Sequence, residues 1–424
     1  MPAGETTPPP PGRPASVSGR VPPDPGASDR ILLVGVSTRA LAESVQAAGH
    51  ACVSVDAFGD LDQKHRIENV GLQRDLRQPY SAAAVVRRAR SLTAASLAYA
   101  ANFENHPRAV RVLAAGRELL GNTPETLRRV RDPEALQQAL RRAGVQAPTT
   151  HFGGRCPRDA RKRAWLRKPA RGGGGGGIQA WSPGDALGPG ELIQERIEGT
   201  PGSLTFIAGP REVVVAGVCE GLAGDVRFGA PGYRYCGSLF PLAASDTLME
   251  RLRVLATALS QEFGLVGLNG IDFVLRDGEP YVLEINPRWC ASVEVIERGR
   301  GASLFAAHVA ACRGGRPALA PAPLRGVFGK AVLYARRDVR IGDSRSWLDR
   351  PDVRDVPFPG EHIRSGQPVC TLLARAADRQ SCLDRLASRA EQLEQELEVP
   401  EPAGRVVARH GPRLAPALEQ VVQP

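Results

Sequence analysis

A run of six consecutive glycines, Gly172 to Gly177, places the strongest single restriction on how this chain can fold. Glycine is unfavourable inside helices and strands because it loses the most conformational freedom on ordering, so the run is predicted to be a loop. The loop follows Lys168, one of only four lysines in a chain whose other basic residues are arginines. Unobstructed backbone N–H groups beside a lysine charge are typical of a phosphate-binding loop. A flexible linker is the alternative, and the GxxxxGK(S/T) pattern of a P-loop is absent.

A β-hairpin is predicted around Asp277-Gly278, a dipeptide that favours a tight turn between two apolar strands. Antiparallel pairing across this turn brings Asp272 close to Glu284, with Asn286 two residues later. Two carboxylates and an amide oxygen are hard ligands that suit magnesium in a nucleotide site. Arg288 follows, where it can neutralise charge on a transferred phosphoryl or acyl phosphate group. Ordinary surface acids on an exposed hairpin are the alternative interpretation.

A third feature lies between these two. Leu192 to Gly199 is predicted to be a strand that ends in a turn. A strand-to-turn hinge of this kind can present backbone groups to the edge of a purine. Taken alone, however, these residues are explained by default as a plain core strand.

The rest of the chain divides into an α/β part followed by a β-rich part. Short apolar strands that alternate with helices predict a βαβ unit near the N-terminus. The expected elements there are strands at 31–36, 51–55 and 96–100 and helices at 39–48 and 82–90. Thr123-Pro124 and Asp132-Pro133 each give the start signal of a helix, and Gly144 ends the second one. The β-rich part has expected strands at 164–168, 192–196, 203–207, 213–218, 271–275 and 281–285.

The final part of the chain, from 326 to 397, is predicted to be less regular. Short strands, a turn at Pro359-Gly360 and a charged helix from about Asp378 to Leu397 are expected there. The segments 1–28 and 401–424 are rich in proline and small or polar residues, which predicts a disordered first tail and a loosely packed last one.

Composition limits the classes of protein that fit. A chain of 424 residues is long enough for roughly two to four domains. Its net charge of +10 is spread thinly without a Lys/Arg block, so nucleic acid is not an expected partner.

No apolar run approaches the roughly 20 residues that span a bilayer, and no secretory signal layout is present, which predicts a cytoplasmic protein without a membrane partner. The eight cysteines include no CxxC pair and are expected to be buried thiols rather than disulfides or zinc ligands.

Taken in order, the lysine-glycine loop, the hinge strand and the D(x11)ExN hairpin resemble the ATP-grasp superfamily over roughly Gly121 to Gly301. The resemblance implies an α/β (α+β) ATP-grasp fold with a Rossmann-like N-terminal domain, a small lid domain and a central metal-binding domain. The boundaries expected on this basis are a tail at 1–28, a Rossmann-like domain at 29–120, linker helices and lid at 121–195, a central subdomain at 196–325, a C-terminal region at 326–400 and a tail at 401–424.

The same resemblance implies a role for each site residue. Lys168 would contact the α- and β-phosphates of ATP. The residues of the loop that would close over the phosphates include Gly173, Gly174, Gly175 and Gly176. The adenine would be held by the Gln194 side chain and by main-chain groups near Glu195 and Ile197. Magnesium, with manganese as an alternative, would be bound by Asp272, Glu284 and Asn286, and Arg288 would act at the reacting centre. Many members carry a second lysine where this chain has Arg131, so either Arg131 takes that role or the contact is missing.

A narrower resemblance comes from three N-terminal segments, Gly35 to Ser44, Asp56 to Asp62 and Asn102 to Pro107. They look like ATP-dependent ligases of one-carbon cofactor biosynthesis, a group that includes proteins similar to the tyramine-glutamate ligase of methanofuran synthesis. Glu104 and Asn105 follow an expected strand and are therefore candidate substrate residues, with a helix N-cap as an equal alternative for Asn105. Separately, Gly329-Lys330-Ala331 and Gly366 to Ala374 resemble the C-terminal region of biotin-carboxylase-like chains.

These features predict a ligase that uses ATP and magnesium to activate a carboxylate as an acyl phosphate for attack by an amine. The expected partners are a small-molecule carboxylate and an amine, and the resemblance also allows a homodimer. Two alternatives remain open at this point. One is a biotin-carboxylase-like reaction through carboxyphosphate, and the other is a non-catalytic protein that senses nucleotide.

Overall fold

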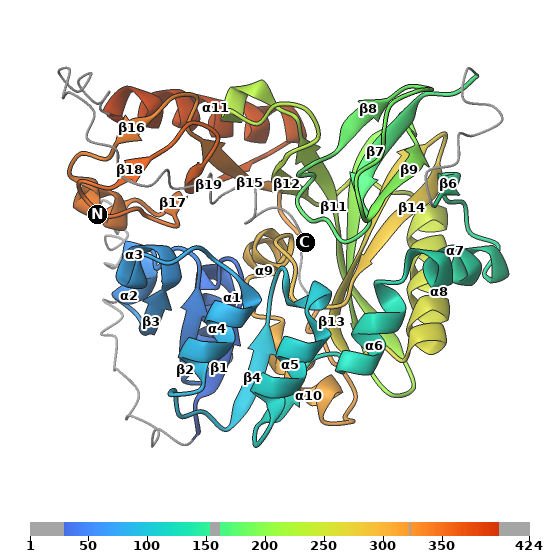
Figure 1. The fold of residues 1–424 in the computed structure, drawn as a ribbon, viewed down its shortest axis with the longest axis horizontal. Helices are drawn as coiled ribbons and strands as arrows, with labels where there is room; N and C mark the ends of the chain where they lie inside the picture. Colours follow the sequence, from blue (N-terminus) through green and yellow to red (C-terminus); the bar gives the residue numbers. More distant parts are fainter. Residues whose placement is uncertain (1–28, 153–161, 322–323, 398–424) are drawn as a thin grey trace, which may run out of the picture.

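The fold is described from a computed structural model, in which residues 29–152, 162–321 and 324–397 are described (Figure 1). Both predicted tails, 1–28 and 401–424, lie outside this part of the chain. Helices and sheets are both present throughout, which confirms the α/β prediction. No helix within the described ranges has the length and apolar character needed to cross a bilayer.

The N-terminal part is a parallel five-stranded sheet in the order β3-β2-β1-β4-β5. Its strands are β1 (Ile31–Val34), β2 (Cys52–Asp56), β3 (Glu68–Gly71), β4 (Ser96–Tyr99) and β5 (Glu118–Leu120). The helices around it are α1 (Arg39–Ala47), α2 (Leu61–Lys64), α3 (Leu72–Leu76), α4 (Ala82–Ala89) and α5 (Pro107–Ala114). The strand order reverses between β1 and β4, which is where open α/β sheets bind ligands at their carboxyl edge. The short 3-10 turn η2 (Phe103–Asn105) directly follows β4 at this edge.

Two capped helices connect the N-terminal sheet to the rest of the chain. They are α6 (Pro124–Val130) and α7 (Pro133–Arg142). The Thr123 hydroxyl accepts a hydrogen bond from the Thr126 N–H, and the Asp132 carboxylate accepts from two N–H groups in the first turn of α7. Both predicted start signals are therefore confirmed, because each side chain satisfies an N–H that the helix itself cannot.

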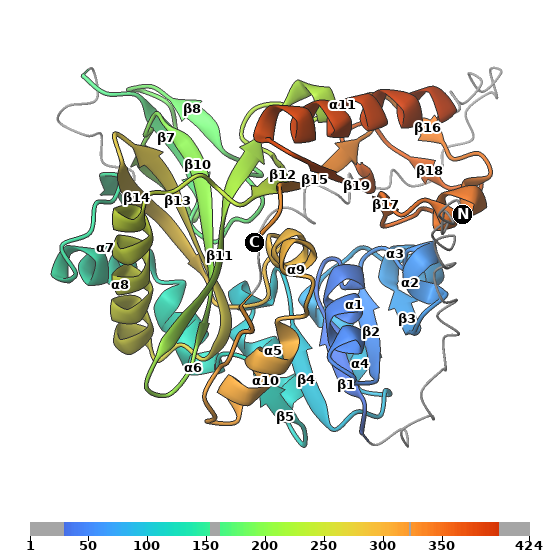
Figure 2. The same cartoon turned by 180° about the vertical axis from the view of Figure 1, so that it is seen from behind.

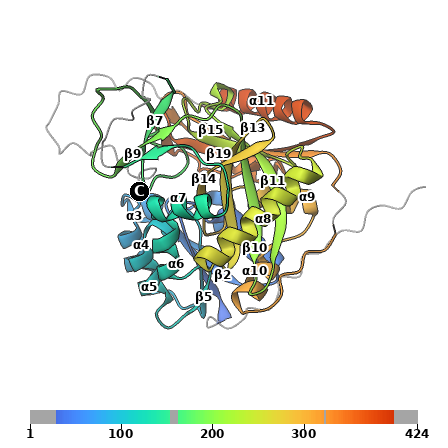
Figure 3. The same ribbon diagram turned by 90° about the vertical axis from the view of Figure 1, so that its right-hand side faces the viewer.

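A small antiparallel sheet follows, in the order β6-β9-β7-β8. Its strands are β6 (Thr150–His151), β7 (Trp165–Pro169), β8 (Gln179–Trp181) and β9 (Glu191–Glu195). Only Trp165, Trp181 and Ile193 form its buried core, with Leu187 packed against them. Figure 3 shows this sheet on the side of the molecule that carries α7. With so few buried apolar groups, this small sheet is less stabilised by its core than the five-stranded and eight-stranded sheets are.

The largest sheet has eight strands in the order β14-β13-β10-β11-β12-β15-β19-β17, and every described pair in it is antiparallel. The strands are β10 (Thr200–Ala208), β11 (Val213–Ala223), β12 (Tyr235–Phe240), β13 (Gly267–Arg276), β14 (Glu279–Asn286), β15 (Val327–Tyr334), β17 (Val353–Arg354) and β19 (Pro368–Ala376). The helices α8 (Asp246–Phe263), α9 (Val293–Arg300), α10 (Phe305–Cys312) and α11 (Arg379–Glu396) pack on it (Figures 1 and 2).

The C-terminal region differs from the sequence prediction of short strands. Strands β15 and β19 have eight and nine residues and extend the central sheet, because β15 pairs with β12. Short strands, as expected, are also present at β16 (Val339–Arg340) and β18 (His362–Ile363). The 3-10 helix η4 (Ser344–Asp349) was not predicted. The Pro359-Gly360 turn and the charged helix, with Asp378 as its N-cap, are confirmed.

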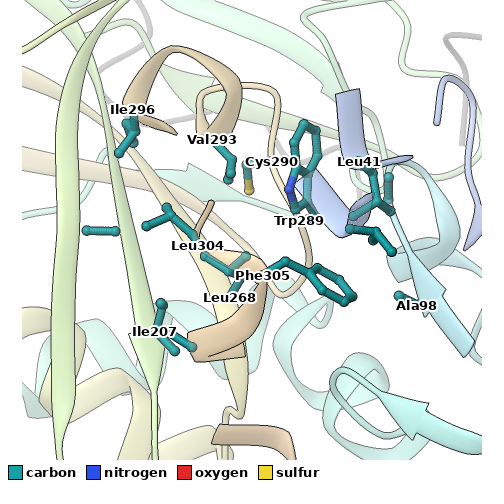
Figure 4. Close-up of a cluster of buried hydrophobic side chains, with 14 of the residues drawn as sticks. Leu41, Ala98, Ile207, Leu268, Trp289, Cys290, Val293, Ile296, Leu304 and Phe305 are labelled. Carbon is teal, nitrogen blue, oxygen red and sulfur yellow. The ribbon is translucent and has the colours of Figure 1, made fainter. Parts of the chain in front are cut away.

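The N-terminal sheet is joined to the central part by an apolar contact and by a buried ionic cluster. In the apolar contact, Leu41 and Ala98 pack against a group that includes Trp289 and Phe305 (Figure 4). In the ionic cluster, the guanidinium of Arg39 donates to both oxygens of Asp355 at 2.9 Å and to Glu294 at 2.5 Å. Lys330 donates to the same Glu294 at 2.8 Å. Because Arg39 is 1% exposed, its charge is balanced by these acids, together with the nearby Glu43 and Asp62, rather than by water.

We expect Arg39→Met to lower the free energy of unfolding by roughly 3–5 kcal/mol, because it leaves Asp355 and Glu294 buried without their main counter-charge. Urea unfolding followed by circular dichroism measures the change. Arg253→Met is the matched control, since the one side-chain partner of Arg253 among the described residues is Glu250 on an exposed helix face, and the change should affect stability little. Equal effects of the two substitutions would contradict the role given to the cluster.

A second prediction concerns Glu297 of α9, which accepts hydrogen bonds from the Ser44 hydroxyl and the Leu304 N–H. Burial raises the pKa of Glu297 from 4.5 to about 7. The folded protein therefore holds this proton up to about pH 7 while the unfolded chain loses it near pH 4.5, so stability falls as pH rises across that window. Glu297→Gln cannot titrate, and its stability relative to wild type should increase by about 3 kcal/mol between pH 4 and pH 8. Thermal unfolding of both proteins across this range is the measurement; a constant difference would contradict the prediction.

Candidate active site

The predicted hairpin is present, and it brings its two acids together. Asp272 on β13 and Glu284 on β14 are direct cross-strand partners. Asn286 lies two residues beyond Glu284 on the same face, and its side-chain amide donates to Asp272 Oδ2 at 2.8 Å. Both acids are only half-buried. Three oxygen-bearing side chains therefore meet at one position on the edge of the central sheet.

The pKa values of the two carboxyl groups are shifted in opposite directions. Burial, followed by the nearby charge of Glu284, raises the pKa of Asp272 to about 6. Burial also acts to raise the pKa of Glu284, but the positive charges of Arg131 and Lys168 outweigh it and hold that pKa below its usual value. Glu284 is consequently the more acidic of the two carboxyl groups.

Lys168 and the glycine loop lie beside this acidic pair. Burial lowers the pKa of Lys168, and the charges of Glu284 and Asp272 act in the opposite direction. The loop between β7 and β8 folds back onto the central sheet, where the Tyr235 N–H donates to Gly174 O at 2.9 Å. Gly175 has φ +73°, and a Cβ there would lie 1.8 Å from Tyr233 O. Only glycine fits at that point of contact.

Residues of the N-terminal sheet complete the cluster. Glu104, in the turn after β4, forms an ion pair with Arg288 in which Oε1 and Nε are 2.9 Å apart. Arg288 also donates to Asn286 Oδ1 at 3.0 Å. Asn105 Oδ1 accepts from Arg131 Nε at 2.9 Å. Glu104 Oε2 and Asn105 Nδ2 are buried and have no hydrogen-bond partner within the described part of the chain. The candidate substrate residues therefore lie next to the candidate metal residues.

The residues predicted to hold adenine, Gln194, Glu195 and Ile197, lie at or just after the end of β9. The Gln194 side chain donates to the Thr150 hydroxyl at 3.1 Å, and the Glu195 N–H donates to Thr149 O at 2.8 Å. These groups hold β6 and β9 together, so an adenine contact by the Gln194 amide would have to share or replace the bond to Thr150. The assignment of Gln194, Glu195 and Ile197 to adenine stays a prediction.

Cysteine chemistry does not contribute to the site. Burial raises the pKa of Cys290, two residues after Arg288, to about 12. Six of the seven described cysteines are buried, the seventh is intermediate, and all seven are free thiols. The expectation of buried thiols holds for these, whereas Cys156 lies outside the described residues.

The side chains present fit magnesium in a nucleotide site. Within the described ranges, no group of three or more His, Cys, Asp or Glu residues could enclose a metal ion. Two carboxylates and an amide oxygen leave most of the coordination sphere open for phosphate oxygens and water, which is how Mg²⁺ is held beside phosphates. Asp272, Glu284 and Asn286 are therefore the residues that would hold it.

Comparison with known proteins shows what this chain and its fold are similar to. Residues 130–292 match the ATP-grasp domain family. The fold is that of biotin carboxylase from Campylobacter jejuni, with a TM-score of 0.64, 16% identity and coverage of 87% of this chain and 91% of that one. The chain has the ATP-grasp fold. An L-amino acid ligase from Bacillus licheniformis shares the ATP-grasp likeness, with a TM-score of 0.63, 14% identity and coverage of 87% of this chain and 98% of that one.

Sequence relatives match a smaller share of this chain than the solved structures do. An uncharacterized protein of Methanocaldococcus jannaschii is 26% identical over 189 residues, which is 43% of this chain and 42% of that protein. The first curated relatives are thus matched over less than half of their own length. The resemblance to ligases of one-carbon cofactor biosynthesis stays a prediction.

Sequence reasoning did not anticipate two features of the site. One is the ion pair between Glu104 and Arg288, because residues 184 positions apart give no local signal of contact. The other is the set of partners that Arg131 has: it donates to Asn105, Glu284 and Gly172 O. The sequence singled out Arg131 because it directly precedes Asp132-Pro133. The groups that accept its hydrogen bonds could not be predicted from the sequence.

We expect Gly175→Ala to detach the glycine loop from the central sheet, because the new Cβ would overlap Tyr233 O. Hydrogen exchange at the Tyr235 amide, whose acceptor is Gly174 O, should become at least about tenfold faster, a loss comparable with one hydrogen bond. Gly174→Ala is the control, since Gly174 has φ +60° but nothing within 4 Å of its added Cβ. Both variants carry the left-handed backbone cost, so similar exchange in the two would show that the contact with Tyr233 is unimportant.

Proposed function

We propose that this protein is an ATP- and magnesium-dependent ligase that activates a carboxylate as an acyl phosphate for attack by an amine. The observation that carries the proposal is the meeting of Lys168 and the glycine loop with Asp272 and Glu284, which come from different sheets. A cationic loop facing a pair of hard oxygen ligands suits a triphosphate with its metal. The ATP-grasp fold supports the same reading.

Each part of the chain would contribute a different task. Lys168 and the loop from Gly173 to Gly176 would bind phosphate oxygens. Magnesium, when bound, supplies positive charge that offsets the charge of the transferred phosphoryl group. Arg288, held in place by Glu104, would stabilise negative charge at the acceptor carboxylate. The closed loop would exclude water, which otherwise hydrolyses the acyl phosphate.

The substrate side is proposed to lie at the carboxyl edge of the N-terminal sheet. Glu104 Oε2 is a buried acceptor and Asn105 Nδ2 a buried donor, and neither has a partner in the described part of the chain. Buried polar groups of this kind are normally paired, so a polar substrate with both a donor and an acceptor would suit them. An amine ligase is favoured over a carboxylase because an amine substrate would supply N–H donors to Glu104 Oε2, the carboxylate oxygen that Arg288 leaves without a hydrogen bond.

Formation of ADP in the presence of paired substrates tests the proposal. Purified protein is incubated with ATP, magnesium and each combination of an amine and an amino acid, and ADP is measured. Turnover that requires both substrates supports the ligase. Turnover that requires bicarbonate instead would establish the carboxylase, and tight ATP binding with no turnover in any combination would favour the sensor.

Glu284→Gln should abolish this turnover, by at least about a thousandfold, while leaving the fold intact. The substitution keeps the shape of the side chain but removes the charge that pairs with Arg131 and would hold the metal. Glu279→Gln on the same strand is the control, because Glu279 lies near the turn and pairs with Arg251 at the surface. Near-normal activity of Glu284→Gln, with an unchanged circular dichroism spectrum, would refute the metal assignment.

A further inference from the structure

Arg131 contacts three parts of the molecule with one buried side chain. Its Nε donates to Asn105 Oδ1 of the N-terminal part at 2.9 Å. Its Nη1 donates to Glu284 Oε2 on the central hairpin at 3.2 Å, and its Nη2 donates to Gly172 O at the start of the glycine loop at 3.1 Å. Arg131 is 9% exposed, so these acceptors largely replace its contact with water.

The planar geometry of the guanidinium couples the positions of these three acceptors. Its N–H donors are fixed in one plane, so the direction of each hydrogen bond is set by the other two. The base of the side chain is also fixed, because Arg131 is the C-cap residue directly after α6 and its N–H donates to Leu127 O. A displacement of the Glu284 carboxylate must therefore alter the bond to Gly172, and a displacement of the loop must alter the bond to Glu284.

We infer that Arg131 is a positioning residue that orients the metal carboxylate Glu284 and holds the glycine loop closed through one guanidinium. This inference rests on the proposed function. Arg131 engages Glu284 Oε2 and leaves the other carboxylate oxygen, Oε1, available for a cation. The same side chain fixes the loop that would cover the phosphates. Metal affinity and loop closure thus depend on a single group, which a lysine could not reproduce because its ammonium is a point charge on a flexible stem.

Arg131→Lys is the informative substitution, because it keeps the charge and removes the fork. Two quantities are measured. The first is hydrogen exchange of the loop amides from Gly173 to Gly176 and of Tyr235 in the protein without ligand. The second is the affinity for Mn²⁺, as a spectroscopic probe for magnesium, in the presence of a non-hydrolysable ATP analogue. We expect exchange to become about tenfold faster and the Mn²⁺ affinity to fall about tenfold, the effect of losing one charged hydrogen bond.

Arg129→Lys is the matched control, since Arg129 lies on the same helix but is exposed and contacts only the neighbourhood of Glu262. It should alter neither quantity. If Arg131→Lys lowers the stability of the fold, Asn105→Ala is tested instead. This substitution removes the acceptor of the Arg131 Nε hydrogen bond, and it should raise the exchange rate and lower the Mn²⁺ affinity by smaller amounts.

The outcomes separate this inference from the proposed function. A wild-type protein that binds neither the ATP analogue nor Mn²⁺ would refute the proposed function, and the exchange experiment, which needs no ligand, would still test the tie between Arg131 and the loop. Faster exchange with lower Mn²⁺ affinity in Arg131→Lys supports the inference. A change in only one of the two, or in neither, overturns it.

Discussion

Two carboxylates opposite each other across a half-buried β-ladder are the constraint on which the rest of this structure depends. Asp272 and Glu284 would repel each other if both were ionised without compensation. The compensation comes from Arg131, Lys168 and Arg288, all of which act on Glu284. These three cations belong to the end of α6, the small sheet and the segment after β14. The acid pair therefore gathers distant parts of the chain around one point.

The parts that surround this point are stabilised to different degrees. The N-terminal sheet is fixed to the central part by the Arg39 cluster and by the apolar contact that includes Leu41 and Phe305. The small sheet has a core of only Trp165, Trp181 and Ile193. Segments that must open and close around a ligand are drawn from the less stable end of a structure. The packing thus favours a rigid base formed by the two larger sheets, with the glycine loop as the part that moves.

The sequence was informative wherever a local signal determined the structure. Asp277-Gly278 predicted the hairpin and so the pairing of Asp272 with Glu284, because a tight turn fixes the register of the strands beside it. Thr123 and Asp132 predicted the starts of two helices for an equally local reason. The roles of the site residues stay predictions, since the fold and the geometry are compatible with them without testing them.

Contacts between residues far apart in the chain could not be predicted from the sequence. The junction of β12 with β15 joins strands separated by the whole of α8, β13, β14, α9 and α10, and no turn specifies it. The same applies to Arg39, whose partners Glu294 and Asp355 lie hundreds of positions away. Such contacts depend on which surfaces of the helices and strands remain exposed to packing after these elements have formed.

The use of arginine at position 131 follows from the same electrostatics. Burial lowers the pKa of Lys168, whereas the charges of Glu284 and Asp272 beside it act to raise that pKa. A second lysine in this position would repel Lys168 and would itself be easier to deprotonate on burial. An arginine keeps its proton under these conditions and distributes its charge over a planar fork. Arg131 can therefore sit beside Lys168, neutralise Glu284 and still donate to Gly172 O, so the positive charge at the acid pair does not depend on the protonation of a second amine.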